Sequence, residues 1–181
     1  MAGIIIENIV ATTQIADELD IQHLVNEIEN SKYDPDEFPG LILHYSEPNT
    51  ISFLFSSGKV VCTGAKNIKD AENAIYKTIN NIQNSVVSTV KEPKIEILNI
   101  VSSSDIGRKL NLKSIVDNIL LDNVEYNPEK FPGLIYKMDD IGMMSILFES
   151  GKIVFTGAKK LEDVTLSISI IEDKLSSMEF L

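Results

Sequence analysis

Along several short stretches of the chain, successive residues fall on two different faces, which is the two-residue period of a β-strand. In residues 50–55, Ile51, Phe53 and Phe55 share one face and Leu54 points to the other. Residues 59–63 alternate in the same way. Because both faces of these strands carry apolar side chains, the pattern predicts a sheet that is apolar on its two sides.

The first half of the chain predicts a strand, a helix, three strands and a second helix. Strand-forming residues fill positions 4–13, 40–45, 50–55 and 59–63, and the turn-rich residues 33–36 predict a loop. Asp20 is the predicted N-cap of the first helix, whose apolar residues have helical spacing: Ile21, Leu24, Val25 and Ile28. The second helix presents one apolar face, made of Ile68, Ala71, Ile75, Ile79 and Ile82.

Two helices in each half are too few to cover both faces of such a sheet. A single layer of helices would cover one face and leave the other open to a binding partner. A β-sandwich or a homodimer interface would also explain a sheet with two apolar faces.

The second half of the chain repeats the first. Phe-Pro-Gly-Leu-Ile occurs at 38–42 and 131–135, Ser-Gly-Lys at 57–59 and 150–152, and Thr-Gly-Ala-Lys at 63–66 and 156–159. The offset is 91 residues up to Val25 and Val116, and 93 residues from Tyr33 and Tyr126 onward. A unit of about 90 residues is too long for a solenoid repeat. We therefore predict two repeats, residues 1–90 and 91–181, connected through residues 84–94 and related by a pseudo-twofold axis.

Composition narrows the class of protein. The 181 residues are 44% hydrophobic, and no apolar run is long enough to span a membrane. The net charge of −11 opposes unspecific affinity for nucleic acid or for an anionic membrane. The single cysteine, Cys62, lies in an apolar run, so we expect a buried thiol in a reducing compartment. Four lysines at equivalent places in the repeats can nevertheless line one face: Lys59, Lys66, Lys152 and Lys159.

The sequence offers little for catalysis. It contains no phosphate loop, no cluster of metal ligands and no Ser/His/Asp arrangement, and neither histidine has a repeated partner. We therefore expect no enzyme, no catalytic residue, no metal and no cofactor. A single phenylalanine in a strand usually belongs to the core. A pair that recurs with the same 17-residue spacing favours a shared function instead: Phe38 with Phe55, and Phe131 with Phe148.

Taken together, these motifs resemble the conserved core of the TATA-box-binding protein family. They include Asn-Ile-Val at 8–10 and 99–101 and Phe-Pro-Gly-Leu-Ile-Tyr at 131–136. The resemblance covers nearly the whole chain and, with the acidic balance, indicates the archaeal branch. It implies an α+β fold in which two similar halves share one curved antiparallel sheet, a saddle, with helices on the convex face. It also implies a general transcription initiation factor that binds and bends A·T-rich (TATA) promoter DNA through the minor groove.

Carried over position by position, the resemblance assigns three kinds of DNA contact. Two intercalating wedges would be formed by Phe38 with Phe55 and by Phe131 with Phe148. Base contacts would come from Asn8, Asn99, Thr63, Thr156, Val10, Val61, Val101 and Val154. Phosphate contacts would come from Lys59, Lys66, Lys137, Lys152, Lys159 and His44. Because His44 stands where the family more usually has arginine, opposite Lys137, its contact is expected to be weak or pH-dependent. Glu37 stands where eukaryotic members have a basic residue.

The resemblance implies partners as well. A transcription factor B-type protein would bind the loop at 126–130, where Glu129 matches an acidic contact of the family, and would connect the complex indirectly to RNA polymerase. Asn127 and Lys130 depart from the eukaryotic pattern there. Without DNA, the open sheet would allow a weak homodimer. We expect no membrane association and a cytoplasmic location, at the archaeal nucleoid.

One alternative from a different class stays open at this point. The same open apolar sheet would suit a protein- or lipid-interaction module that does not bind DNA. A preference for A·T-rich over G·C-rich duplex would separate the two functions.

Overall fold

The computed structural model describes residues 3–83, 90, 92–118 and 123–177. The predicted connection at 84–94 and the predicted boundary between residues 90 and 91 lie largely outside these described residues. The elements in chain order are β1 (Ile5–Gln14), α1 (Ile21–Glu27), β2 (Ser31–Asp34), β3 (Phe38–Ser46), β4 (Asn49–Phe55), β5 (Lys59–Ala65), α2 (Ile68–Ile82), β6 (Glu96–Asp105), α3 (Leu112–Asn118), β7 (Val124–Glu125), β8 (Leu134–Met138), the 3₁₀ turn η1 (Asp139–Ile141), β9 (Met143–Leu147), β10 (Lys152–Ala158) and α4 (Leu161–Ser177).

The strands follow the order β2-β3-β4-β5-β1-β6-β10-β9-β8-β7 in one sheet. The chain divides into two compact units. We call Asn8–Leu98 the first unit, and Met1–Glu7 together with Asn99–Leu181 the second unit. Each unit has the same antiparallel ladder, β3-β4-β5-β1 in the first and β8-β9-β10-β6 in the second.

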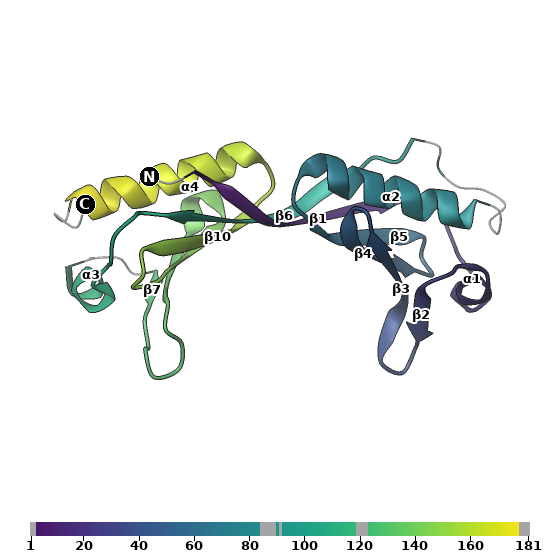
Figure 1. Ribbon diagram of the computed structural model, residues 1–181, viewed down its shortest axis with the longest axis horizontal. Helices are drawn as coiled ribbons and strands as arrows, with labels where there is room; N and C mark the ends of the chain where they lie inside the picture. Colours follow the sequence, from purple (N-terminus) through teal and green to yellow (C-terminus); the bar gives the residue numbers. More distant parts are fainter. Residues whose placement is uncertain (1–2, 84–89, 91, 119–122, 178–181) are drawn as a thin grey trace. The chain divides into compact units, whose positions relative to one another are not determined.

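In the first unit, burial follows the predicted alternation. Along β4, Leu54 is fully buried, whereas its neighbours Phe53 and Phe55 are half-buried. The buried set of the sheet packs against α2, which lies above β4 and β5 in Figure 1. This core consists of Ile9, Ala11, Leu41, Leu43, Leu54, Val60 and Cys62 from the strands and Ala71, Ala74, Ile75, Ile79 and Ile82 from the helix.

The second unit has the same arrangement with α4 as its covering helix. The helix contacts β9 and β10 and lies above β10 in Figure 1. Its core consists of Ile100, Leu134, Leu147, Ile153, Phe155 and Ala158 from the strands and Val164, Ile168, Ile171 and Leu175 from α4. Phe155 therefore occupies the place that Cys62 has in the first unit. The thiol is buried as predicted, and burial raises its pKa.

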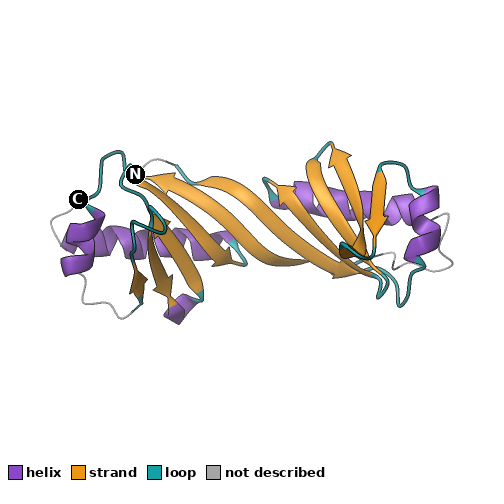
Figure 2. Cartoon of the chain, turned by 90° about the horizontal axis from the view of Figure 1, so that it is seen from below, coloured by secondary structure: helices purple, strands orange, loops and turns teal. Residues whose placement is uncertain are grey.

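In each unit the other face of the sheet is left open. Figure 2, seen from below, shows the strands in front of the long helix in both units. The half-buried residues that pair across the ladders lie on this side, which we call the open face: Ile42, Phe53 and Val61 in the first unit, and Ile135, Ile146 and Val154 in the second. In the part of the chain that the structure describes, no helix lies over it, so the prediction of a single helix layer is confirmed.

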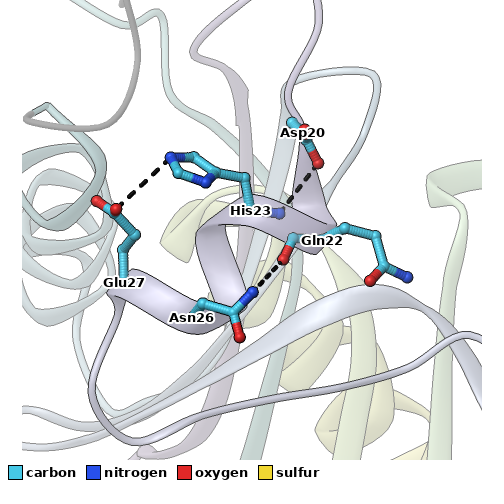
Figure 3. Close-up of polar contacts among 5 residues, drawn as sticks. All are labelled: Asp20, Gln22, His23, Asn26 and Glu27. Carbon is cyan, nitrogen blue, oxygen red and sulfur yellow. Dashed lines mark hydrogen bonds and ion pairs between the residues drawn. The ribbon is translucent and has the colours of Figure 1, made fainter.

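Both short helices start at a side-chain cap, and the cap of α1 is the predicted Asp20. The carboxylate Oδ1 of Asp20 accepts a hydrogen bond from the backbone N–H of His23 at 3.0 Å, as Figure 3 shows. Asn111 does the same for the backbone N–H of Ser114 at 3.0 Å. In Figure 3, the imidazole of His23 also lies 3.6 Å from a carboxylate oxygen of Glu27, one turn further along α1.

The predicted loop before the first wedge is partly a strand. Residues 31–34 form β2 and pair with β3, through Ser31 with Leu43 and Lys32 with Ile42, so the prediction of a loop over 33–36 is wrong for its first two residues. In the second unit, β7 pairs with β8 through Glu125 and Ile135. Proline and aspartate favour turns, but pairing with the neighbouring strand decides the conformation here.

Candidate functional site

The four predicted wedge phenylalanines form two ring pairs, one on each open face. The ring centroids of Phe38 and Phe55 lie 5.8 Å apart at an interplanar angle of 59°. Those of Phe131 and Phe148 lie 6.1 Å apart at 65°. The rings are not sealed by another layer, since Phe131 is 39% exposed and the other three are half-buried.

The glycine of the Phe-Pro-Gly motif lies beneath each ring pair. A Cβ atom on Gly40 would be 2.8 Å from Cε1 of Phe38 and 3.1 Å from Cε1 of Phe55. A Cβ atom on Gly133 would be 2.7 Å from Cε1 of Phe131. The motif is therefore more than a turn signal, because the absence of a side chain lets the two rings lie directly over the backbone.

In each unit an asparagine, a threonine and a glycine form a hydrogen-bonded cluster, and we call it the amide cluster. In the first unit, the N–H of Gly64 donates to Oδ1 of Asn8 at 2.7 Å, and Nδ2 of Asn8 donates to Oγ1 of Thr63 at 3.0 Å. In the second unit, the N–H of Gly157 donates to Oδ1 of Asn99 at 2.7 Å, and Nδ2 of Asn99 donates to Oγ1 of Thr156 at 3.0 Å. The two units therefore contain the same cluster.

A β-bulge places the glycine of each amide cluster. The ladder between β1 and β5 shifts register between Ile9 and Ala11, and Gly64 has φ 97°. The ladder between β10 and β6 shifts between Phe155 and Ala158, and Gly157 has φ 103°. Glycine adopts such backbone angles without strain, and the bulge turns its N–H toward the asparagine. The repeated Thr-Gly-Ala-Lys motif therefore serves to orient this amide.

The glycine N–H fixes which way each amide points. An N–H can only donate, so Oδ1 of Asn8 must face Gly64 and Nδ2 must face away from it. One N–H of Nδ2 is used by Thr63, and the other has no partner among the described residues. The threonine hydroxyl accepts from the amide and also lies 3.3 Å from its Oδ1, so its proton can point to that oxygen or outward. Each amide cluster therefore offers one N–H of the amide, and a hydroxyl that can turn to donate, to an external acceptor.

The predicted valines lie beside these donors. Val61 pairs with Phe53 on β4 and Val154 pairs with Ile146 on β9, so each continues an apolar row on the open face. Val10 and Val101 are half-buried residues of β1 and β6. The rest of these rows was not assigned to DNA contact from the sequence: Ile42 and Phe53 in the first unit, and Ile135 and Ile146 in the second. The signal for Phe53 was the alternation in residues 50–55.

The predicted phosphate ligands are exposed, and two of them face carboxylates of the protein. Nζ of Lys137 lies 2.7 Å from Oε1 of Glu125, and this hydrogen bond raises the pKa of the lysine. Nζ of Lys152 lies 3.7 Å from Oε1 of Glu7, which also accepts from the hydroxyl of Ser103 at 2.6 Å. The exposed set comprises Lys59, Lys66, Lys137, Lys152, Lys159 and His44.

The loop before the second wedge is a tight turn. The backbone N–H groups of Lys130 and Phe131 both donate to the carbonyl of Asn127, at 3.0 and 2.9 Å. Glu129 is exposed on this turn. Its carboxylate is thus presented on a constrained loop next to Phe131.

Two other kinds of site are absent from the described part of the chain. It contains no group of three or more His, Cys, Asp or Glu residues that could hold a metal ion. It also contains no helix of the length and apolar character needed to cross a membrane.

The comparisons with known proteins agree with one another. Residues 3–85 and 94–178 match the family described as transcription factor TFIID (or TATA-binding protein, TBP). The TATA-box-binding protein of Archaeoglobus fulgidus is 41% identical over 173 residues, covering 96% of this chain and 94% of that protein. TATA-box-binding protein 1 of Haloferax volcanii is 40% identical over 176 residues, covering 97% and 93%. The solved structure of Methanococcus jannaschii TBP has a TM-score of 0.88 and 38% identity, covering 96% of this chain and 98% of that one. This likeness confirms the expected fold class, α+β with an antiparallel sheet.

Proposed function

The chain belongs to the TATA-box-binding protein family, and from this premise we propose that its two open faces bind the minor groove of A·T-rich promoter DNA. The protein is then a general transcription initiation factor of the archaeal type. This is a family of transcription factors, so the expectation that the chain is not an enzyme is confirmed. The observation that carries the assignment of residues is the amide cluster, present at equivalent positions of both units.

The amide clusters suit the minor groove of A·T pairs. These pairs present only acceptors there, adenine N3 and thymine O2. Asn8 with Thr63 and Asn99 with Thr156 supply outward donors to such acceptors. A G·C pair adds the guanine amino group, a donor, which would meet the same donors and a row of valines. The result is a preference for A·T pairs without a code for individual bases.

The ring pairs suit a distorted duplex. We propose that Phe38 with Phe55 and Phe131 with Phe148 each enter a base step and kink it. Unstacking a step costs a few kcal/mol, and pyrimidine–purine steps such as TA deform most easily. Widening the groove in turn lets the apolar rows of the open faces bury themselves, at about 25 cal/mol per Å² of apolar area. The protein then recognises the DNA sequence partly through the energy needed to bend it.

Phosphates supply the electrostatic part of the affinity. The proposed contacts are Lys59, Lys66, Lys137, Lys152 and Lys159, with His44 as a weaker sixth. Five lysines give a slope of log affinity against log salt of roughly −4 to −5. For a chain of net charge −11, this moderate slope means that much of the remaining affinity is non-electrostatic.

We further propose that a transcription factor B-type protein docks on the turn that carries Glu129. The two open faces are nearly equivalent, so DNA contacts alone orient the protein poorly on a promoter. A partner that binds only the second loop would set the direction and lead on to RNA polymerase. In the absence of DNA, the open faces would support a weak homodimer, and the protein would work at the nucleoid in the cytoplasm.

Competition between duplexes tests the proposal. In a mobility-shift assay, an unlabelled A·T-rich TATA duplex should displace the labelled TATA duplex far more effectively than a G·C-rich duplex of equal length. Equal displacement, together with binding to lipid vesicles or to an apolar peptide, would favour the interaction module instead. Footprinting with a transcription factor B-type protein then tests Glu129. Glu129→Ala should lose the added footprint and keep the affinity for DNA.

A further inference from the structure

The outer ends of the two open faces carry opposite charges. In the first unit, Lys32 of β2 pairs with Ile42 of β3, which pairs with Phe53 of β4. Residues directly opposite each other in a ladder point to the same face, so Lys32 lies at the outer end of this apolar row. In the second unit, Glu125 of β7 occupies the matching place, opposite Ile135. We call these two ends the rims of the open faces.

Each rim has a second residue, and this residue also differs between the two units. Two positions along the strand from Ile42 lies His44, and two positions from Ile135 lies Lys137, each on the same face as its rim neighbour. The rim of the second unit is therefore a carboxylate followed by a lysine. The rim of the first unit is a lysine followed by a histidine.

Both rims contain one lysine held by one carboxylate. Nζ of Lys137 lies 2.7 Å from Oε1 of Glu125, and Nζ of Lys32 lies 2.9 Å from Oε2 of Glu37. A hydrogen bond from the backbone N–H of Glu37 to the carbonyl of Asp34, 3.1 Å long, holds the loop that presents Glu37. The two ion pairs are alike in length and exposure. The lysine, however, lies on the edge strand β2 in the first unit and on β8, next to the edge strand β7, in the second.

We propose that Lys32 makes in the first unit the phosphate contact that Lys137 makes in the second, and so takes over a role that the shorter His44 side chain fills poorly. The inference rests on the proposed function, in which DNA lies against the open faces. Lysine has a long flexible stem and a charge that does not depend on pH near neutrality, whereas histidine loses its charge there. Glu37 holds the ammonium group on the open face until a phosphate replaces the carboxylate.

The exchange of Glu37 for a phosphate costs little. Both side chains of the pair are about two-thirds exposed, at 64% for Lys32 and 66% for Glu37. Ion pairs as exposed as this contribute little to stability, because water and salt screen them. The hydrogen bond to Glu37 raises the pKa of Lys32, so the lysine is charged at neutral pH. Substitution of Lys32 should therefore change DNA binding without unfolding the protein.

Salt titration of TATA binding by fluorescence anisotropy tests this inference. Lys32→Gln should reduce the magnitude of the salt slope by about 0.9 and weaken binding to A·T-rich and G·C-rich duplexes by the same factor. Lys137→Gln should have an equal effect. Lys69→Gln, an exposed lysine on α2, is the matched control and should leave the slope unchanged.

A charge exchange makes the test sharper. Lys32→Glu should weaken binding further than Lys32→Gln, because it places a carboxylate near the phosphates. Adding His44→Lys to that variant rebuilds the rim of the second unit and should restore the wild-type slope. An unchanged slope in Lys32→Gln, or a loss of about 0.9 in His44→Ala instead, would overturn the inference. The proposed function would survive either result if Lys137→Gln still lowers the slope and the preference for A·T pairs persists.

Discussion

The amide clusters lead to a prediction in which one substitution removes two donors and spares the fold. In the native protein, the N–H of Gly157 lies 2.7 Å from Oδ1 of Asn99. In Asn99→Asp, a carboxylate oxygen takes the place of Oδ1 and still accepts from this N–H. The second oxygen replaces Nδ2 and can no longer donate to Thr156, whose hydroxyl must then turn its proton inward. Both outward donors of the cluster are therefore lost.

The size of the effect follows from the number of donors. Each hydrogen bond contributes about 0.5–1.5 kcal/mol, so two of them account for about 1–3 kcal/mol. This corresponds to a loss of roughly 5- to 150-fold in affinity for a TATA duplex. The new carboxylate faces base acceptors and strengthens the loss. Because the bond to Gly157 remains, the midpoint of thermal unfolding should move by less than the 2–4 °C that about 1 kcal/mol produces.

The assay combines fluorescence anisotropy on a labelled TATA duplex with thermal unfolding followed by circular dichroism. Asn73→Asp, on the exposed side of α2, adds the same charge away from the open face and serves as the control. If Asn99→Asp bound as tightly as Asn73→Asp, with both folded, the amide cluster would not donate to the bases.

Three further predictions concern the fold that holds the site. Asp20→Ala loses the 3.0 Å cap on His23 and should lower the free energy of unfolding by about 1 kcal/mol in urea denaturation; an unchanged midpoint would contradict the capping role. Gly133→Ala would bring a Cβ atom to 2.7 Å from Phe131, costing about 1–3 kcal/mol of stability and weakening DNA binding; wild-type values for both would refute the close packing of the rings. Burial raises the pKa of Tyr45 above its ordinary value of 10.0, so the folded state holds this proton more tightly than the unfolded chain. Stability should therefore be fully present below pH 10 and fall as the pH rises above it, with buried Cys62 adding to the loss from about pH 9. Tyr45→Phe should lessen the fall in urea denaturation between pH 8 and pH 11, and an identical fall would count against this assignment.

Short sequence patterns were enough to predict the two faces of the sheet and the start of a helix. The alternation predicted that Phe53 and Leu54 lie on opposite faces of β4, and burial agrees with it. The cap residue Asp20 predicted the start of α1, since a cap depends only on neighbours in the sequence. Ile68 was assigned to the apolar face of the second helix but is 36% exposed. It is the first residue of α2, where no preceding turn shields it.

Pairing between distant segments could not be predicted in this way. The strand β2 contains turn-forming residues, and only its ladder with β3 makes it a strand and places Lys32 on the open face. The bulge that points Gly64 at Asn8 depends on the register between β1 and β5. Sequence recurrence indicated that these motifs matter, but the hydrogen bonds that explain them join residues 55–58 positions apart.

The central claim is that the ring pairs of the open faces open and kink A·T-rich DNA, and the end-to-end distance of the bound duplex tests it most directly. Fluorescence energy transfer between dyes on the two ends of a TATA duplex should show strong bending by the wild type and by Tyr76→Ala, an exposed aromatic on α2. Phe148→Ala should bind more weakly and bend the duplex less when saturated. Wild-type energy transfer in the saturated Phe148→Ala complex would contradict the claim.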